Sequence, residues 1–193
     1  MQTFKNNNVI EIHELKIKGV FKIVLNYFED DRGRFMRLFD KQVFAKTEIP
    51  HNWVQENLSI NSKKGIIRGL HFIKQPHTDG KLIRCSKGKV WDVVVDLRKD
   101  SKTFGNHLAN TLSEDKYEWL YIPKGFAHGF CTMTEKSEII YKHNTFYQKD
   151  FDSGIVWNDP DLSIQWPVQN PLLSEKDKAL MTLKDFKLNL KGL

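Results

Sequence analysis

The chain has 193 residues, of which 40% are hydrophobic and 12% aromatic, enough for one buried core, and this composition excludes a disordered protein. Its net charge of +6 comes from basic residues interleaved with 24 acidic ones, which argues against a nucleic-acid-binding arm. The opening segment has no secretory-signal pattern, and no apolar run approaches the roughly 18 residues of a membrane span. We therefore expect a single domain over residues 1–193, cytoplasmic and without membrane contact.

Short segments rich in Val, Ile, Phe, Trp and Tyr recur along the chain between turn signals. This pattern is typical of strands, which we expect at residues 21–25, 82–85, 90–97, 119–122 and 138–141. The sequence Ser-Lys-Gly-Lys at 86–89 predicts a hairpin turn between two of these strands. Many short strands with few helical runs indicate a β-sandwich or barrel.

Helical patterns are scarce. Ser174, with Asp177 three positions later, predicts a capped helix near the end of the chain. A short helical turn is expected from residue 40 or 41 to Phe44. The two cysteines, Cys85 and Cys131, fall in apolar stretches that resemble strands, so we expect reduced core thiols rather than a disulfide or a zinc site.

The most informative feature is an ordered set of motifs. In chain order they are RGLHF at 68–72, KLIR at 81–84, DLR at 96–98, IPKGFAHGF at 122–130, YK at 141–142, WNDP at 157–160 and LSEKD at 173–177. Together they closely resemble the dTDP-4-dehydrorhamnose 3,5-epimerase family, from about Asp30 to Asp177. The resemblance implies an all-β cupin-type jelly roll (a double-stranded β-helix barrel) with a few short helices, one of them near the C-terminus. It also implies a homodimer.

The activity that the resemblance implies is epimerisation at C-3, C-5 or both of a nucleotide-linked 4-keto sugar such as dTDP-4-keto-6-deoxy-glucose, with neither metal nor organic cofactor. It implies His71 as the catalytic base, Asp177 as the carboxylate that pairs with it and Tyr141 as the proton donor. Binding roles carry over to Arg32, Gln55, Asn57, Arg68, Lys81, His128 and Lys176.

These residue types suit the chemistry. Proton transfer from a carbon beside a ketone to a histidine is uphill by about 17 kcal/mol, so a base alone is insufficient and the enolate oxygen needs a cation. Lys81 is our first candidate for that cation, with Arg68 as the alternative. Inversion also needs a donor on the opposite face, which a tyrosine phenol can supply. Arg32 and Lys176 would bind the pyrophosphate, and Phe130 or Tyr147 would stack on the sugar or base.

Several of these residues also have structural interpretations. His71 and His128 could be hydrogen-bonded strand histidines, and Asp177 could do no more than cap its helix. Tyr141 could be a packing residue, with Tyr147 as a competing donor.

Four positions depart from the family pattern. Arg37 stands where a glutamate of the nucleotide-sugar pocket is common, Asp152 replaces a glutamate, and Lys-His-Asn at 142–144 replaces Lys-Thr-Thr. We assign Arg37 and Asp152 to substrate binding. Because arginine can bind the guanine edge bidentately, an alternative substrate is a GDP-linked 4-keto sugar such as a heptose.

Other classes of function remain as alternatives. A metal-dependent cupin enzyme usually carries a His-x-His motif, which this chain lacks. A non-catalytic jelly roll that binds nucleotide sugars would use the same fold without proton exchange. Within the enzyme class, a single-centre epimerase would present nearly the same residues.

Overall fold

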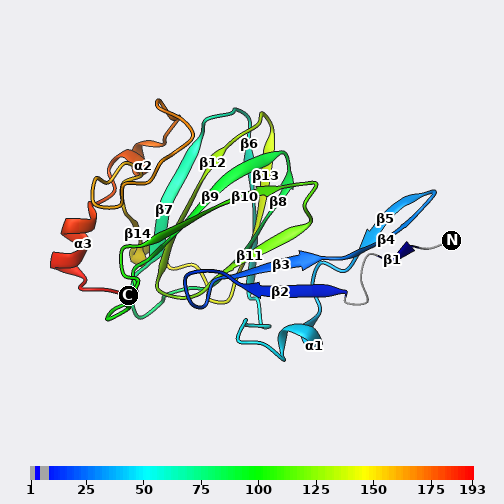
Figure 1. Cartoon of the computed structure of the whole chain (residues 1–193). Coiled ribbons are helices and arrows are strands. Elements are labelled where there is room, and N and C mark those ends of the chain that lie inside the picture. The colour runs from blue at the N-terminus through cyan, green and yellow to red at the C-terminus, as the bar shows by residue number, and fades with distance from the viewer. Residues whose placement is uncertain (1–2, 5–8) are drawn as a thin grey trace.

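The computed structural model describes residues 3–4 and 9–193, and its main body consists of two antiparallel sheets packed face to face (Figure 1). The six-stranded sheet has the order β2 (Ile10–Glu14), β3 (Phe21–Leu25), β11 (Glu118–Ile122), β8 (Lys81–Lys87), β13 (Ser137–His143), β6 (Gln55–Asn61). The five-stranded sheet has the order β10 (His107–Ser113), β9 (Lys89–Asp96), β12 (Phe126–Thr132), β7 (Ile67–Ile73), β14 (Asp152–Gly154). All five strands expected from the sequence are present, within one residue or inside a longer strand.

From β6 to β14, successive strands cross from one sheet to the other, except β9 and β10, which pair with each other. The prediction of a hairpin at residues 86–89 is wrong, because β8 pairs with β11 and β13 whereas β9 pairs with β10 and β12. Gly88 has the positive φ of +73° that a tight turn needs, but the turn joins two layers rather than two paired strands. Residues 123–125 make a similar crossing between β11 and β12. This exchange between sheets confirms the all-β jelly roll.

The core between the sheets is built by the inward faces of both layers. Ile83, Leu120 and Ile139 come from the six-stranded sheet, and Val94 and Phe130 from the five-stranded sheet. Both cysteines are buried free thiols, as expected. The outer face of each sheet is covered by an apolar cluster of its own. The cavity described below therefore opens between the inner faces.

Short helices lie at the edges of this body. The predicted turn is α1 (Lys41–Phe44), capped by Asp40, and the predicted C-terminal helix is α2 (Glu175–Lys178), where the Ser174 side chain accepts from the backbone N–H of Asp177. A 3-10 turn, η1, spans Lys149–Phe151. Sequence analysis missed α3 (Leu183–Asn189), which packs on the outer face of the five-stranded sheet. No helix of the described chain is long and apolar enough to cross a membrane.

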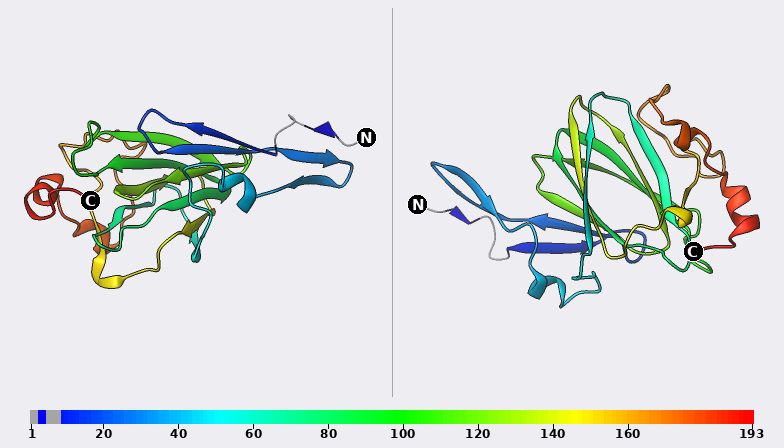
Figure 2. Two further views of the ribbon diagram at one scale, coloured as in Figure 1. Left: turned by 90° about the horizontal axis from the view of Figure 1, so that it is seen from below. Right: turned by 180° about the vertical axis from the view of Figure 1, so that it is seen from behind.

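A hairpin projects from the main body, as both views in Figure 2 show. It is formed by β4 (Tyr27–Asp30) and β5 (Gly33–Met36), and together with β1 (Thr3–Phe4) it makes a small third sheet. Arg32 lies in the turn at its tip, next to Gly33, whose φ of +120° favours glycine. Arg32 is therefore carried away from the cavity of its own chain.

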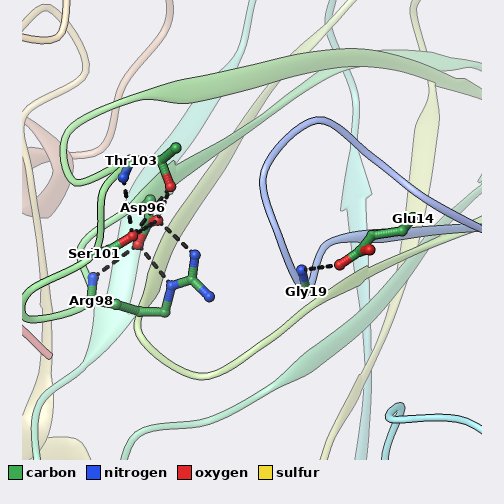
Figure 3. A network of polar contacts seen from close by, with 6 residues as sticks. All are labelled: Glu14, Gly19, Asp96, Arg98, Ser101 and Thr103. Atoms are coloured by element: carbon green, nitrogen blue, oxygen red, sulfur yellow. Dashed lines mark hydrogen bonds and ion pairs between the residues drawn. The ribbon is translucent and has the colours of Figure 1, made fainter.

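The turn after β9 is held by a buried carboxylate (Figure 3). Asp96 is fully buried and accepts hydrogen bonds from the Arg98 guanidinium and from the hydroxyls of Ser101 and Thr103. Burial opposes ionisation, but these donors outweigh it and lower the pKa of Asp96. The network fixes the chain where it leaves the five-stranded sheet.

Candidate active site

A cavity of about 250 Å³ opens between the two sheets at the end formed by β6, β7, β8, β12 and β13. It gathers eleven of the residues singled out from the sequence, from six strands, a loop and a helix. They are Gln55, Asn57, Arg68, His71, Lys81, His128, Phe130, Tyr141, Tyr147, Asp152 and Lys176. One concave site therefore brings together residues that are up to 121 positions apart.

His71 and Asp177 form a hydrogen-bonded pair at this cavity. Nε2 of His71 lies 2.6 Å from Oδ1 of Asp177, and the aspartate is 4% exposed. Burial raises the pKa of Asp177, but the bond to His71, the charge of that histidine and further contacts with Ser174 and Lys176 lower it below its usual range. Asp177 is therefore an anion bonded to the imidazole, and the cap of α2 is supplied by the Ser174 side chain rather than by the Asp177 carboxylate. The other ring nitrogen, Nδ1, makes no hydrogen bond to any described residue.

Two glycines, Gly69 and Gly129, bring β7, which carries His71, into close contact with β12. A Cβ on Gly69 would lie 2.6 Å from the Cα of Gly129 and 2.7 Å from the carbonyl oxygen of His128. Gly69 also has a φ of +120°, a conformation that residues with a Cβ rarely adopt. This contact and a bulge in β12 set His71 opposite His128 across β7 and β12.

Tyr141 approaches the cavity from the opposite sheet. It lies on β13, whereas His71 lies on β7, so the two side chains enter the same space from facing layers. Burial and the negative charge of Asp92 both raise the pKa of the Tyr141 phenol. The phenol therefore keeps its proton at neutral pH, as a proton donor must.

The ammonium group of Lys81 lies beside the histidine. Lys81 is 8% exposed, and its Nζ donates to the backbone oxygen of His71 at 3.2 Å. A buried cation that lines the same cavity as His71 can stabilise negative charge that develops on a substrate oxygen. Arg68, the alternative, is an exposed residue whose Nε donates to Asn61 at 2.8 Å.

The mouth of the cavity carries a polar group of side chains. Lys176 contacts Oδ2 of Asp152 at 2.5 Å, and the same oxygen accepts from the Tyr147 hydroxyl at 2.9 Å. The Gln55 side chain accepts from the backbone N–H of Tyr147 and donates to Asn57. Tyr147 is 54% exposed, so its ring is available to stack on a planar group that enters the mouth.

Two of the residues assigned to binding lie outside this cavity. The guanidinium of Arg32 pairs with Asp30 at 2.6 Å on the projecting hairpin. Arg37 pairs with Asp40 at 2.8 Å, next to the start of α1. Their roles in substrate binding therefore stay predictions.

Comparison with known proteins identifies the family. The sequence profile of dTDP-4-dehydrorhamnose 3,5-epimerase matches residues 14–185. The chain belongs to the dTDP-4-dehydrorhamnose 3,5-epimerase family. The enzyme of this name from Shigella flexneri is 48% identical over 151 residues, which cover 78% of this chain and 83% of the relative.

Solved structures of this family superpose closely on the chain. The dTDP-4-dehydrorhamnose 3,5-epimerase of Bacillus anthracis, solved with TDP and pyrophosphate bound, is 42% identical and gives a TM-score of 0.87, covering 90% of this chain and 99% of that one. The Legionella pneumophila enzyme, in complex with dTDP-4-keto-L-rhamnose, is 36% identical with a TM-score of 0.87, covering 94% and 96%. The cupin-type fold and the epimerase class are thereby established for this family member.

Sequence analysis missed two carboxylates that bind histidines at the cavity. Asp92 is fully buried and lies 2.7 Å from Nε2 of His128, and Asp79 lies 2.8 Å from Nδ1 of His143. Asp92 stands within an apolar strand, where a charged residue signals a buried partner, so this signal was available. Asp79 lies in a loop and gave no such signal. Within the described residues, no group of three or more His, Cys, Asp or Glu side chains is arranged to hold a metal ion.

Proposed function

We propose that this family member inverts both carbons beside the ketone of a dTDP-linked 4-keto-6-deoxy sugar, C-3 and C-5. The observation that carries the proposal is the His71–Asp177 pair facing Tyr141 across one cavity. A base and an acid on opposite sides of a ring are what inversion requires, since removal and return of a proton on one face would only restore the starting centre. The relatives from Shigella flexneri and Escherichia coli are named 3,5-epimerases, which supports inversion at both carbons, whereas a 33% identical relative from Streptomyces niveus is named a 3-epimerase.

The reaction follows from the positions of these groups. Nδ1 of His71 takes the proton from the carbon, and the electron pair of the broken C–H bond moves to the ketone oxygen to form an enolate. Asp177, bonded to Nε2, stabilises the imidazolium that results. The ammonium of Lys81 stabilises the enolate oxygen. The phenol of Tyr141 then donates its proton to the opposite face as the ketone reforms.

We also propose that the mouth binds the nucleotide. Tyr147 offers an exposed ring for the base, and Lys176 offers a cation for the pyrophosphate. In the described chain Lys176 pairs with Asp152, so binding of the diphosphate would exchange one anionic partner for another.

The active form that we propose is a homodimer. Strand β6 is an edge of the six-stranded sheet and exposes Leu58 by 54% and Ile60 by 66%. An open edge with exposed aliphatic side chains is normally covered, and a second copy of the chain would cover it. The projecting hairpin, with Phe35 exposed by 72%, gives each copy a segment that can reach the other and deliver Arg32 to its cavity.

Deuterium uptake tests the reaction directly. The protein is incubated in deuterated water with dTDP-4-keto-6-deoxy-glucose, and separately with a GDP-linked 4-keto sugar, and the labelled carbons are identified by NMR and mass spectrometry. Uptake with inversion at both carbons of the dTDP sugar supports the proposal. Uptake at one carbon would identify a single-centre epimerase, and preference for the GDP sugar would give Arg37 the guanine-binding role.

The matched control is a histidine outside the cavity. His71→Ala should abolish uptake, whereas His13→Ala, which changes a half-exposed histidine on β2, should leave it unchanged. If the parent protein binds dTDP yet exchanges nothing, the non-catalytic binding protein replaces the epimerase.

A further inference from the structure

A second histidine–aspartate pair faces the same cavity from the other sheet. His143 lies on β13, two residues after Tyr141, and its Nδ1 lies 2.8 Å from Oδ2 of Asp79. Burial opposes ionisation of Asp79, but the charge of Lys81 and the bond to His143 lower its pKa below the usual range, so it remains an anion. The reaction described above does not use this pair.

Inversion of two centres creates a need for proton resupply. After one inversion His71 holds the proton taken from the carbon, and Tyr141 is a phenolate. Before the second inversion His71 must lose that proton and Tyr141 must gain one, while the nucleotide sugar still fills the cavity. A group that carries protons from solvent to Tyr141 would shorten the time between the two inversions.

Two histidine rings pack beside Tyr141, and their surroundings differ. The His128 ring lies 6.2 Å away, edge-on, but its side chain is only 5% exposed and its Nε2 is held by the fully buried Asp92. The His143 ring is nearly parallel to Tyr141, with centroids 6.2 Å apart and planes at 18°. Its side chain is 16% exposed, and its Nε2 makes no hydrogen bond to any described residue. His143 is thus the more exposed of the two neighbours, and its Nε2 is available to carry a proton.

We propose that His143, held by Asp79, is a proton relay that reloads Tyr141 between the two inversions. A proton on Nε2 of His143 passes through a bridging water to the phenolate oxygen and leaves neutral imidazole and phenol. The imidazole then takes a proton from a buffer acid or hydronium ion. Asp79 stabilises the imidazolium in the charged half of the cycle.

This inference rests on the proposed function and adds a residue that acts through Tyr141 rather than on the reacting carbon. A histidine at this position can hold and release a proton near neutral pH, whereas a hydroxyl side chain such as threonine can hydrogen-bond but cannot hold an extra proton.

The test compares the two inversions in His143→Asn. The asparagine amide can keep the bond to Asp79, because it occupies the place of Nδ1, but it cannot carry a proton. In rapid-quench experiments with dTDP-4-keto-6-deoxy-glucose, we expect the first inversion to stay within about twofold of the parent. The second should slow by about 10- to 100-fold, so that singly inverted sugar accumulates. His13→Asn is the matched control and should behave as the parent.

Chemical rescue separates a relay from a structural role. Added imidazole should restore the second inversion of His143→Asn several-fold, because a small acid can reload the phenolate in place of the side chain. Asp79→Asn should slow the same step, less severely. Parent-like turnover of His143→Asn, or an equal loss of both inversions that imidazole does not restore, would overturn the relay alone. Absence of exchange in the parent protein would instead overturn the proposed function.

Discussion

The bond between His71 and Asp177 can be tested with an isosteric change, Asp177→Asn. The amide nitrogen can donate to Nε2 of His71, which moves the ring proton to Nδ1, the nitrogen that must accept the proton of the substrate. The loss of a charge-assisted bond to the imidazolium costs about 3 kcal/mol, and restoring the productive tautomer costs about 1–2 kcal/mol more. At 1.36 kcal/mol per factor of ten, the total of about 4–5 kcal/mol predicts that the exchange rate falls by about 10³- to 5 × 10³-fold.

The assay is deuterium uptake at saturating substrate, with dTDP affinity and thermal unfolding measured on the same samples. The Ser174 side chain accepts from the backbone of residue 177, so the cap of α2 should survive the change. Asp185→Asn is the control, because Asp185 caps α3 far from the cavity by accepting from Thr182. A loss of less than tenfold in Asp177→Asn, with the fold intact, would refute the role assigned to this carboxylate.

Three further results are expected. Tyr141→Phe should retain proton exchange at the carbon that His71 attacks but should lower inversion by at least about 10²-fold, measured by NMR of the product. Asp96→Ala should lower the free energy of unfolding by about 3–5 kcal/mol in denaturant titrations at neutral pH. The change leaves the Arg98 guanidinium and the Ser101 hydroxyl, drawn in Figure 3, without their buried acceptor. Since the folded pKa of Asp96 is lowered, its stabilisation is present above the ordinary carboxyl pKa near 4 and disappears as the pH falls through the folded value, so parent and variant should converge in acid. Ile60→Lys should shift the protein toward monomer in sedimentation experiments, as expected if β6 is the interface.

The strands were predictable because each is a local pattern, whereas their partners were not. Residues 86–89 have the composition of a hairpin turn, yet the strands that they join belong to different sheets. Pairing of these strands with each other would have placed them in one layer, but the fold instead buries the inward faces of β8 and β9 against each other in the common core. The spacing of residues in the sequence does not show whether β8 and β9 pair in one sheet or pack against each other from two sheets. The helix α3 was missed although Thr182 and Asp185 form a capping box that was visible in the sequence.

The site was predictable to the extent that the motifs identified the family. His71, Tyr141 and Lys81 were singled out in this way, and all three line the cavity. The pairing of His143 with Asp79 has no such signal, because the two residues are 64 positions apart and each is ordinary by itself. The family pattern also gave no hint that Arg32 and Arg37 would lie outside the cavity of their own chain.

The three histidines that line the cavity are each bonded to an aspartate, but their side chains are exposed to different extents. Each has one ring nitrogen bonded to an aspartate, so the ring orientation is fixed before substrate enters, and little reorganisation is needed during the reaction. The side chain of His71 is 31% exposed, that of His143 16% and that of His128 5%. The most open histidine can meet the substrate, and the intermediate one can exchange protons with solvent. The most buried one is held by Asp92 and packs edge-on against Tyr141. The roles proposed for the three pairs therefore differ because the three histidines lie at different depths between the sheets.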